Sequence, residues 1–309
     1  MKTLAAFFKL IRWPNLFFIA LTQCLFYYAV FASLAPENFF PVNHFYFALL
    51  VLASLVIAAA GYIINDYFDV QIDAVNKPRR IVIDKLVKRR WAIIWHWLLS
   101  GLGILISAYL SYRLKSWVII SGNILSVVLL LFYSTTFKKK ILSGNIIIAS
   151  LTAWVIMVVY FFTRSLLLLH NQQQVFDDKR FFKFTILYAG FAFIVSIIRE
   201  VVKDMEDVEG DRRFNCRTMP IAWGIPASKV FTAVWLVVCI AVLVIVQLYA
   251  WQLGWLLIIA YTVVLVIVPL LFLLRNLYRA NTAGQFHSLS SGIKLVMLAG
   301  ILSMLFFIF

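Results

Sequence analysis

The feature that most constrains this chain is a series of apolar runs, each about 20 residues long. One of them, residues 45–64, reads FYFALLVLASLVIAAAGYII and contains no charged side chain. A run of this length and composition can cross a bilayer as a helix. Nine such runs occur, at residues 14–35, 45–64, 91–111, 117–133, 144–163, 182–198, 230–249, 253–274 and 291–309.

Composition supports a membrane protein. The chain has 309 residues, of which 64% are hydrophobic and only 13% are charged. A soluble domain carries about 25% charged residues. We therefore predict an all-α fold, a polytopic membrane bundle of about nine transmembrane helices, with residues 1–309 forming one integral-membrane domain.

The formal net charge of +15 could suggest nucleic-acid binding, but the distribution of the charge favours another explanation. If nine helices alternate direction, 22 of the 28 Lys and Arg lie on the side of the N-terminus and of the loops after helices 2, 4, 6 and 8. The positive-inside rule places that side in the cytoplasm. We expect a multi-pass protein of the cell (inner) membrane, an active face toward the cytoplasm, contact with membrane lipids and no nucleic-acid partner. Nothing in the sequence predicts an oligomeric state.

The carboxylates are concentrated in two short windows, residues 65–73 and 199–213, which hold nine of the 13 Asp and Glu. Within each window three aspartates are spaced by three and then four residues. They are Asp66, Asp69 and Asp73 in the first window, and Asp204, Asp207 and Asp211 in the second. Steps of three and four keep side chains on one face of a helix. Each window is therefore predicted to extend the end of a helix.

The windows follow the second and the sixth apolar run, so four helices separate them and both emerge on the same side of the membrane. This is a direct repeat, whereas many transporters contain inverted repeats. Two clusters with matched spacing also argue against a solvated acidic loop, which would explain one window alone.

The residue types in the windows predict a binding site for a hard cation. Oxygen ligands without histidine or thiolate select Mg²⁺ or Ca²⁺. Mg²⁺ is usually held by one or two carboxylates together with phosphate oxygens of a substrate. Basic residues follow both windows, and they can take the remaining phosphate charge. The pattern thus predicts two halves of a clamp for Mg²⁺ and a phosphate group.

These residues resemble a known family. The segment NDYFDVQIDAVNKPRR is similar to the first aspartate-rich motif of the UbiA superfamily of intramembrane prenyltransferases, and KDMEDVEGD is similar to the second. IRWPN, with Arg12 and Asn15, resembles the entry to the first helix of that family. FYSTTFKKKILSGN, with Tyr133, Lys140 and Asn145, resembles the loop after its fourth helix. The resemblance covers essentially the whole chain.

The resemblance implies a Mg²⁺-dependent transferase that moves a polyprenyl group from a prenyl diphosphate to a lipophilic acceptor. The similarity of the two motifs implies that the donor is geranylgeranyl diphosphate. The motifs are most similar to those of members of the geranylgeranylglycerylphosphate geranylgeranyltransferase type, which act on a glycerol-phosphate ether lipid. Family members that prenylate aromatic or quinone precursors, of the 4-hydroxybenzoate, homogentisate or naphthoate type, are the alternative. An ion-coupled transporter remains the alternative of a different class, because aspartates within membrane segments also mark such proteins.

The resemblance also implies roles for particular residues. The implied metal ligands are Asn65, Asp69, Asp73, Asp207 and Asp211. The acids implied in catalysis are Asp66, Asp69, Asp204 and Asp207. The implied contacts to the diphosphate are Arg12, Arg79, Tyr133, Lys140 and Lys203. The chain departs from the family after the first motif, where residues 80–85 read RIVIDK and lack the usual proline and glycine turn.

Overall fold

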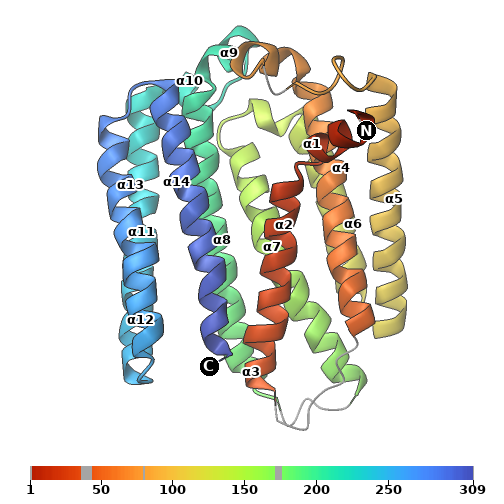
Figure 1. The fold of residues 1–309 in the computed structure, drawn as a ribbon, viewed down its shortest axis with the longest axis vertical. Helices are drawn as coiled ribbons and strands as arrows, with labels where there is room; N and C mark the ends of the chain where they lie inside the picture. The colour runs from red at the N-terminus through yellow and green to blue at the C-terminus, as the bar shows by residue number, and fades with distance from the viewer. Residues whose placement is uncertain (1, 36–43, 79–80, 171–175, 309) are drawn as a thin grey trace. The chain divides into compact units, whose positions relative to one another are not determined.

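The computed structural model describes residues 2–35, 44–78, 81–170 and 176–308. Helices account for nearly all of the secondary structure in these ranges (Figure 1). In chain order the elements are α1 (Lys2–Leu10), α2 (Trp13–Leu25), the π-helix η1 (Phe26–Phe31), α3 (Ala32–Leu34), α4 (His44–Asn76), α5 (Arg89–Leu114), α6 (Trp117–Thr135), the 3₁₀-helix η2 (Phe137–Lys139), α7 (Ser143–Leu169), α8 (Asp178–Glu206), α9 (Val208–Arg213), α10 (Met219–Ala222), α11 (Gly224–Gln252), α12 (Leu256–Thr262), the π-helix η3 (Val263–Ile267), α13 (Val268–Arg279), α14 (Ala283–Leu302) and the 3₁₀-helix η4 (Ser303–Phe307).

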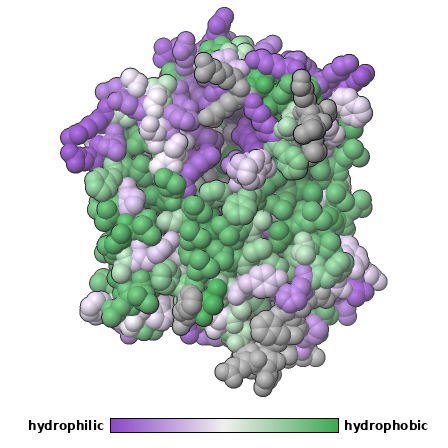
Figure 2. Space-filling model, viewed as in Figure 1, coloured by the Kyte–Doolittle hydropathy of each residue, from purple (hydrophilic) through white to green (hydrophobic). Residues whose placement is uncertain are grey.

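Nine helical segments of the described chain are long and apolar enough to cross a membrane, which confirms the predicted bundle. Each overlaps one of the nine apolar runs, and most bounds agree within several residues. The larger differences are in α4 and α8, where the helix continues past the last apolar residue into an aspartate-rich window, and in α14, which begins at Ala283, before the apolar run at residues 291–309. Figure 2 shows hydrophobic side chains along the sides of the helices and hydrophilic ones near helix ends, as lipid contact requires.

The described residues fall into two compact units. The first unit comprises Met1–Phe137 and Trp154–Leu187, and the second comprises Lys138–Ala153 and Tyr188–Phe309. Helices α7 and α8 each contribute one part to each unit. The first aspartate-rich window therefore belongs to the first unit, and the second window belongs to the second unit.

In the first unit, α4, α5 and α6 lie side by side (Figure 1). Close approach of α5 to α4 depends on Gly103, since a Cβ atom there would lie 2.5 Å from Ile57 Cγ1. Small residues serve this purpose at many helix contacts in membranes. A chain of polar contacts also ties three helices together: Asn123 donates to Ser107 Oγ at 2.8 Å, and Trp154 Nε1 donates to Asn123 Oδ1 at 3.0 Å.

In the second unit, an apolar core is built from α8, α11, α13 and α14. The hydroxyls of Tyr188 and Ser303 lie 3.0 Å apart, which joins α8 to the end of α14. The start of α14 is fixed by a capping box in which Thr282 and Gln285 bond each other's backbone N–H groups. This packing holds the part of α8 that leads into the second window.

Candidate active site: two aspartate-rich helix ends

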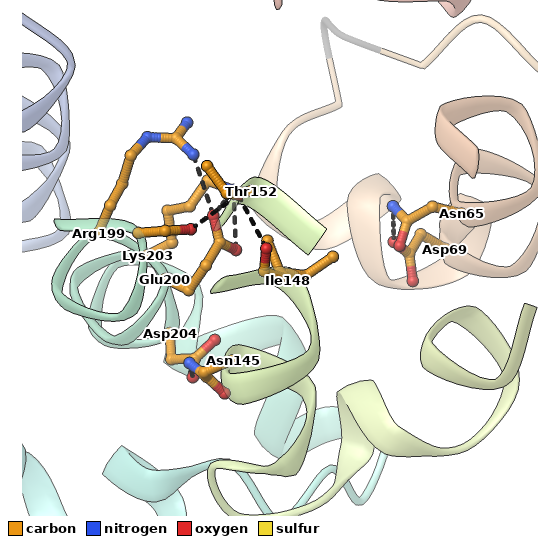
Figure 3. A network of polar contacts seen from close by, with 10 residues as sticks. Asn65, Asp69, Asn145, Ile148, Thr152, Arg199, Glu200, Lys203 and Asp204 are labelled. Atoms are coloured by element: carbon orange, nitrogen blue, oxygen red, sulfur yellow. Dashed lines mark hydrogen bonds and ion pairs between the residues drawn. The ribbon is translucent and has the colours of Figure 1, made fainter. Parts of the chain in front are cut away.

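The first window forms the last three turns of α4. Within it, Asn65 Nδ2 donates a hydrogen bond to Asp69 Oδ2 at 2.7 Å, one turn away (Figure 3). Asp69 is buried, and the other amide atom, Asn65 Oδ1, is also buried and has no hydrogen-bond partner. A buried carbonyl oxygen without a partner costs about 1–3 kcal/mol. The pair therefore presents an oxygen ligand that nothing in the protein satisfies.

Arg12 is paired with the first aspartate of this window. Its Nη2 donates to Asp66 Oδ1 at 2.5 Å, and its guanidinium lies 5.3 Å from the centre of the Tyr62 ring. Arg12 has a left-handed backbone, with φ of 52°, at the junction between α1 and α2. Burial lowers the pKa of this guanidinium, but Asp66 and Tyr62 raise it more, so the net shift is upward. The contact links the segment before the first membrane helix to the window.

The segment after the first window is compact, although it lacks the usual proline and glycine. Val82, Ile83 and Val87 are buried in one apolar cluster with α1, and Ile83 and Val87 form an isolated bridge. Asp84 takes a left-handed backbone, with φ of 69°, and accepts a hydrogen bond from Arg89 Nε at 2.9 Å. The apolar residues that replace the family pattern thus anchor this loop by burial.

The second window differs from the first in its backbone. Helix α8 ends at Glu206, Asp207 lies at the junction, and α9 carries Asp211. The helical hydrogen bonds continue through the junction, because Asp207 N–H donates to Lys203 O at 2.9 Å and Asp211 N–H donates to Asp207 O at 3.1 Å. The three-and-four spacing is therefore kept on a nearly continuous helical path, and Asp211 is buried.

Asp204, the first aspartate of this window, is held by a residue of α7. Asn145 Nδ2 donates to Asp204 Oδ2 at 2.8 Å, and Figure 3 shows the two side chains meeting between α7 and α8. Two turns further along the same helix pair, the hydroxyls of Thr152 and Ser196 lie 3.2 Å apart. Asn145 follows the left-handed residue Leu142, with φ of 57°, at the start of α7. This turn brings the amide to Asp204.

The remaining predicted residues fall in both units. Asp73 lies on the last turns of α4 and Tyr133 on α6, both in the first unit. Lys140, which is exposed, precedes α7, and Lys203 lies on α8, both in the second unit. Arg79 lies outside the described residues.

The donor set fits Mg²⁺ by its chemistry. It consists of carboxylates and one amide oxygen, and Asn65 Oδ1 is oriented so that the protein leaves it unsatisfied. Throughout the described ranges, no three His, Cys, Asp or Glu side chains form a ready-made metal site. Mg²⁺ does not need one, because it is commonly bound by one or two carboxylates plus phosphate oxygens.

Several contacts of the site were not predicted from the sequence. They are the Arg12–Asp66 pair, the Asn145–Asp204 hydrogen bond, the Glu206–His287 contact of 3.0 Å, and a group of charged side chains formed by Arg199, Glu200 and Lys203 (Figure 3). The last group had a visible signal, since residues 199, 200 and 203 have helical spacing directly after an apolar run. The others join residues from 54 to 81 positions apart, which spacing does not indicate.

The curated proteins to which this chain is similar include several that share one name. A digeranylgeranylglyceryl phosphate synthase of Methanothermobacter thermautotrophicus is 32% identical over 193 residues, which cover 62% of this chain and 61% of the relative. The chain thus spans about three fifths of the length of the curated relatives that it matches first.

Among solved structures, one of a digeranylgeranylglyceryl phosphate synthase is 22% identical, has a TM-score of 0.61 and covers 99% of both chains. A UbiA homologue from Archaeoglobus fulgidus, bound to DMAPP and Mg²⁺, is 14% identical with a TM-score of 0.60, covering 96% of this chain and 98% of that one. At these identities the likeness establishes the fold of an integral, multi-pass membrane protein. The sequence pattern of the UbiA prenyltransferase family matches residues 24–298, and the chain therefore belongs to this family.

Proposed function

We propose that this protein is a Mg²⁺-dependent intramembrane prenyltransferase that moves a polyprenyl group from a prenyl diphosphate to a lipophilic acceptor. The observation that carries the proposal is the Asn65–Asp69 pair, whose buried Oδ1 oxygen has no partner in the protein. Such an arrangement is costly unless a cation completes it. Membership of the UbiA prenyltransferase family and the A. fulgidus homologue with DMAPP and Mg²⁺ support the same reading.

The proposed ligands of Mg²⁺ are Asn65, Asp69 and Asp73 from the first window and Asp207 and Asp211 from the second. When bound, Mg²⁺ would supply positive charge that stabilises diphosphate as a leaving group. Asp66 and Asp204 support the windows, each through a partner, Arg12 and Asn145 respectively.

The protein's own cations take the remaining charge of the diphosphate. The proposed contacts are Arg12, Arg79, Lys140 and Lys203, with the hydroxyl of Tyr133. In the reaction, the allylic C–O bond breaks and its electron pair leaves with the diphosphate. A hydroxyl oxygen of the acceptor forms the new C–O bond, and its proton goes to an oxygen of the released diphosphate. The reaction requires a site that excludes water, because water would otherwise convert the allylic cation to the alcohol.

A glycerol-phosphate ether lipid is the proposed acceptor, and geranylgeranyl diphosphate is the proposed donor. The support is the name of the relatives, digeranylgeranylglyceryl phosphate synthase, and the wording of the two motifs. The family likeness alone would also accommodate an aromatic acceptor, so the experiment must include both classes.

The test is mass spectrometry of products from purified full-length protein in nanodiscs. Geranylgeranyl diphosphate is supplied with a glycerol 1-phosphate that carries one geranylgeranyl ether, or with 4-hydroxybenzoate or homogentisate. We expect the diether phosphate, no product in EDTA, and full recovery with Mg²⁺. Full turnover in EDTA would disprove the metal site. Prenylation of an aromatic acceptor alone would disprove the proposed lipid acceptor.

We further propose that the windows face the cytoplasm, as the 22 basic residues on that side suggest. In a cysteine-free variant, cysteines introduced at Gln71 and Val208 should react with a membrane-impermeant thiol reagent only in inside-out vesicles. A cysteine at the exposed Lys115, which caps the C-terminus of α5, is the matched control and should react only from outside. The reverse labelling pattern would reverse the topology.

A further inference from the structure

Three charged side chains of α8 form a tight group at the start of the second window, before its three aspartates. Glu200 Oε1 accepts hydrogen bonds from Arg199 Nη1 and from Lys203 Nζ, each at 2.9 Å (Figure 3). Lys203 Nζ also lies 3.1 Å from Glu200 Oε2. The side chains of Arg199 and Glu200 are only 17% and 10% exposed. All three belong to the second unit.

The burial of Arg199 separates this group from ordinary basic residues at a membrane edge. Lys and Arg that only mark the cytoplasmic end of a helix extend their charged heads into water. Arg199 directly follows the apolar stretch of α8, yet its side chain is covered by protein, and its Nε is buried without a hydrogen-bond partner. An unpaired guanidinium N–H in such a place is costly unless a ligand accepts from it.

The free edge of the Arg199 guanidinium suits an anion. Arg199 Nη1 donates to Glu200, whereas the buried Nε has no hydrogen-bond partner. A guanidinium matches phosphate or carboxylate through two parallel hydrogen bonds, so the free Nε suits an anion with at least two oxygen atoms.

We propose that Arg199, oriented by Glu200, binds the anionic headgroup of the acceptor, a phosphate monoester if the proposed function holds, on which this inference rests. A helix rises 1.5 Å per residue, so Arg199 lies about 12 Å along the helical path from Asp207, toward the apolar part of α8. The new bond forms at the carbon next to the departing diphosphate. The acceptor headgroup must therefore lie beside the diphosphate, on the side from which the prenyl chain extends into the apolar part of the helix.

The first experiment measures binding without turnover. Thermal unfolding of the full chain in nanodiscs is followed in EDTA, without prenyl diphosphate, as the monogeranylgeranyl glycerol 1-phosphate or its dephosphorylated alcohol is added. We expect the phosphate to stabilise the wild type and the alcohol not to. The Arg199→Gln variant should lose this stabilisation, Arg199→Lys should retain part of it, and the exposed control Arg275→Gln, on α13, should retain all of it. Equal stabilisation by phosphate and alcohol in the wild type would overturn the inference without any variant.

The second experiment separates the two substrates. Loss of one charge-assisted hydrogen bond corresponds to about tenfold to a hundredfold, so Arg199→Gln should raise KM for the acceptor by this factor and leave KM for the prenyl diphosphate unchanged. A rise in KM for the prenyl diphosphate instead would overturn the inference. Stabilisation by 4-hydroxybenzoate, lost in Arg199→Gln, with none by the glycerol phosphate, would support the anion site and disprove the proposed lipid acceptor.

Discussion

Asn145 shows how a single residue outside both aspartate-rich windows acts on one of them. Its amide donates to Asp204 at 2.8 Å, and this contact joins α7 to the end of α8. An amide fits here because it donates a hydrogen bond to the carboxylate without adding a charge. We therefore expect Asn145 to act as a positioning residue for the second window.

The Asn145→Ala variant should lower kcat by about tenfold to a hundredfold, because a small displacement of an active-site group costs this much. Loss of the hydrogen bond should also lower the free energy of unfolding by about 1 kcal/mol. Turnover and thermal unfolding in nanodiscs check both values. Thr152→Val, which removes the hydroxyl contact with Ser196 between α7 and α8, is the control and should leave kcat nearly unchanged. Normal kcat in Asn145→Ala would show that this contact has no role in the site.

At the scale of elements, close packing of α4 and α5 depends on which glycine faces the neighbouring helix. A Cβ atom at Gly103 would meet Ile57 Cγ1 at 2.5 Å and Val56 Cγ2 at 3.2 Å. A Cβ atom at Gly101, two residues earlier on α5, would meet nothing within 4 Å. The two positions therefore form a matched pair on one helix.

Gly103→Ala should destabilise the protein by about 1–3 kcal/mol, since the added methyl forces the two helices apart. Gly101→Ala should be neutral or stabilising by up to about 1 kcal/mol, because alanine favours the helix. Thermal unfolding of both variants in the same detergent checks the difference. Equal melting temperatures would mean that α4 and α5 can separate slightly at no cost.

The helical elements were predictable from the sequence because lipid contact demands long apolar runs, and the nine expected segments are confirmed. The ends were less predictable. The run at residues 45–64 stops at the first polar residue, whereas α4 continues to Asn76, because the polar window keeps helical hydrogen bonds. The loop at residues 81–88 could not be foreseen either, since burial of Val82, Ile83 and Val87 depends on contacts with α1, more than seventy residues earlier.

At the scale of the whole molecule, the two windows come from different units, and the proposed function makes them act on one diphosphate. The roles of their aspartates remain predictions. They were accessible from the sequence because Asp66, Asp69 and Asp73 repeat the spacing of the second window. The partners that hold them were not accessible, because Arg12 and Asn145 lie 54 and 59 residues from the acids they contact.

When two groups act as a unit, the effects of removing each one on the reaction rate do not add in the double variant. Asp69→Ala and Asp207→Ala should each lower kcat by about a hundredfold or more, as loss of a fixed electrostatic contact does. The double variant should be scarcely worse than either single one. Glu209→Ala, an exposed acid of the second window, is the control and should keep normal turnover. Multiplying effects in the double variant would show that the windows act independently.

The apolar cluster beneath α1 has a consequence for biosynthesis. Leu10 is fully buried against Val82, Ile83 and Val87, but the ribosome makes α1 more than seventy residues before these partners. At about 5–20 residues per second, the apolar face of α1 waits several seconds for them. During that time an amphipathic helix can rest in the headgroup region of the membrane.

If α1 cannot pack against residues 82–87 after they are made, the chain should still insert its membrane helices, but the loop at residues 81–88 should not fold. Leu10→Asp should therefore make Lys85 and Lys88 sensitive to trypsin, while Phe8→Asp, on the exposed side of α1, should not. Equal resistance of both variants would mean that the loop folds without α1. If only Leu10→Asp exposes the loop, α1 is translated well before residues 82–87 and reaches its final place only after they have been made.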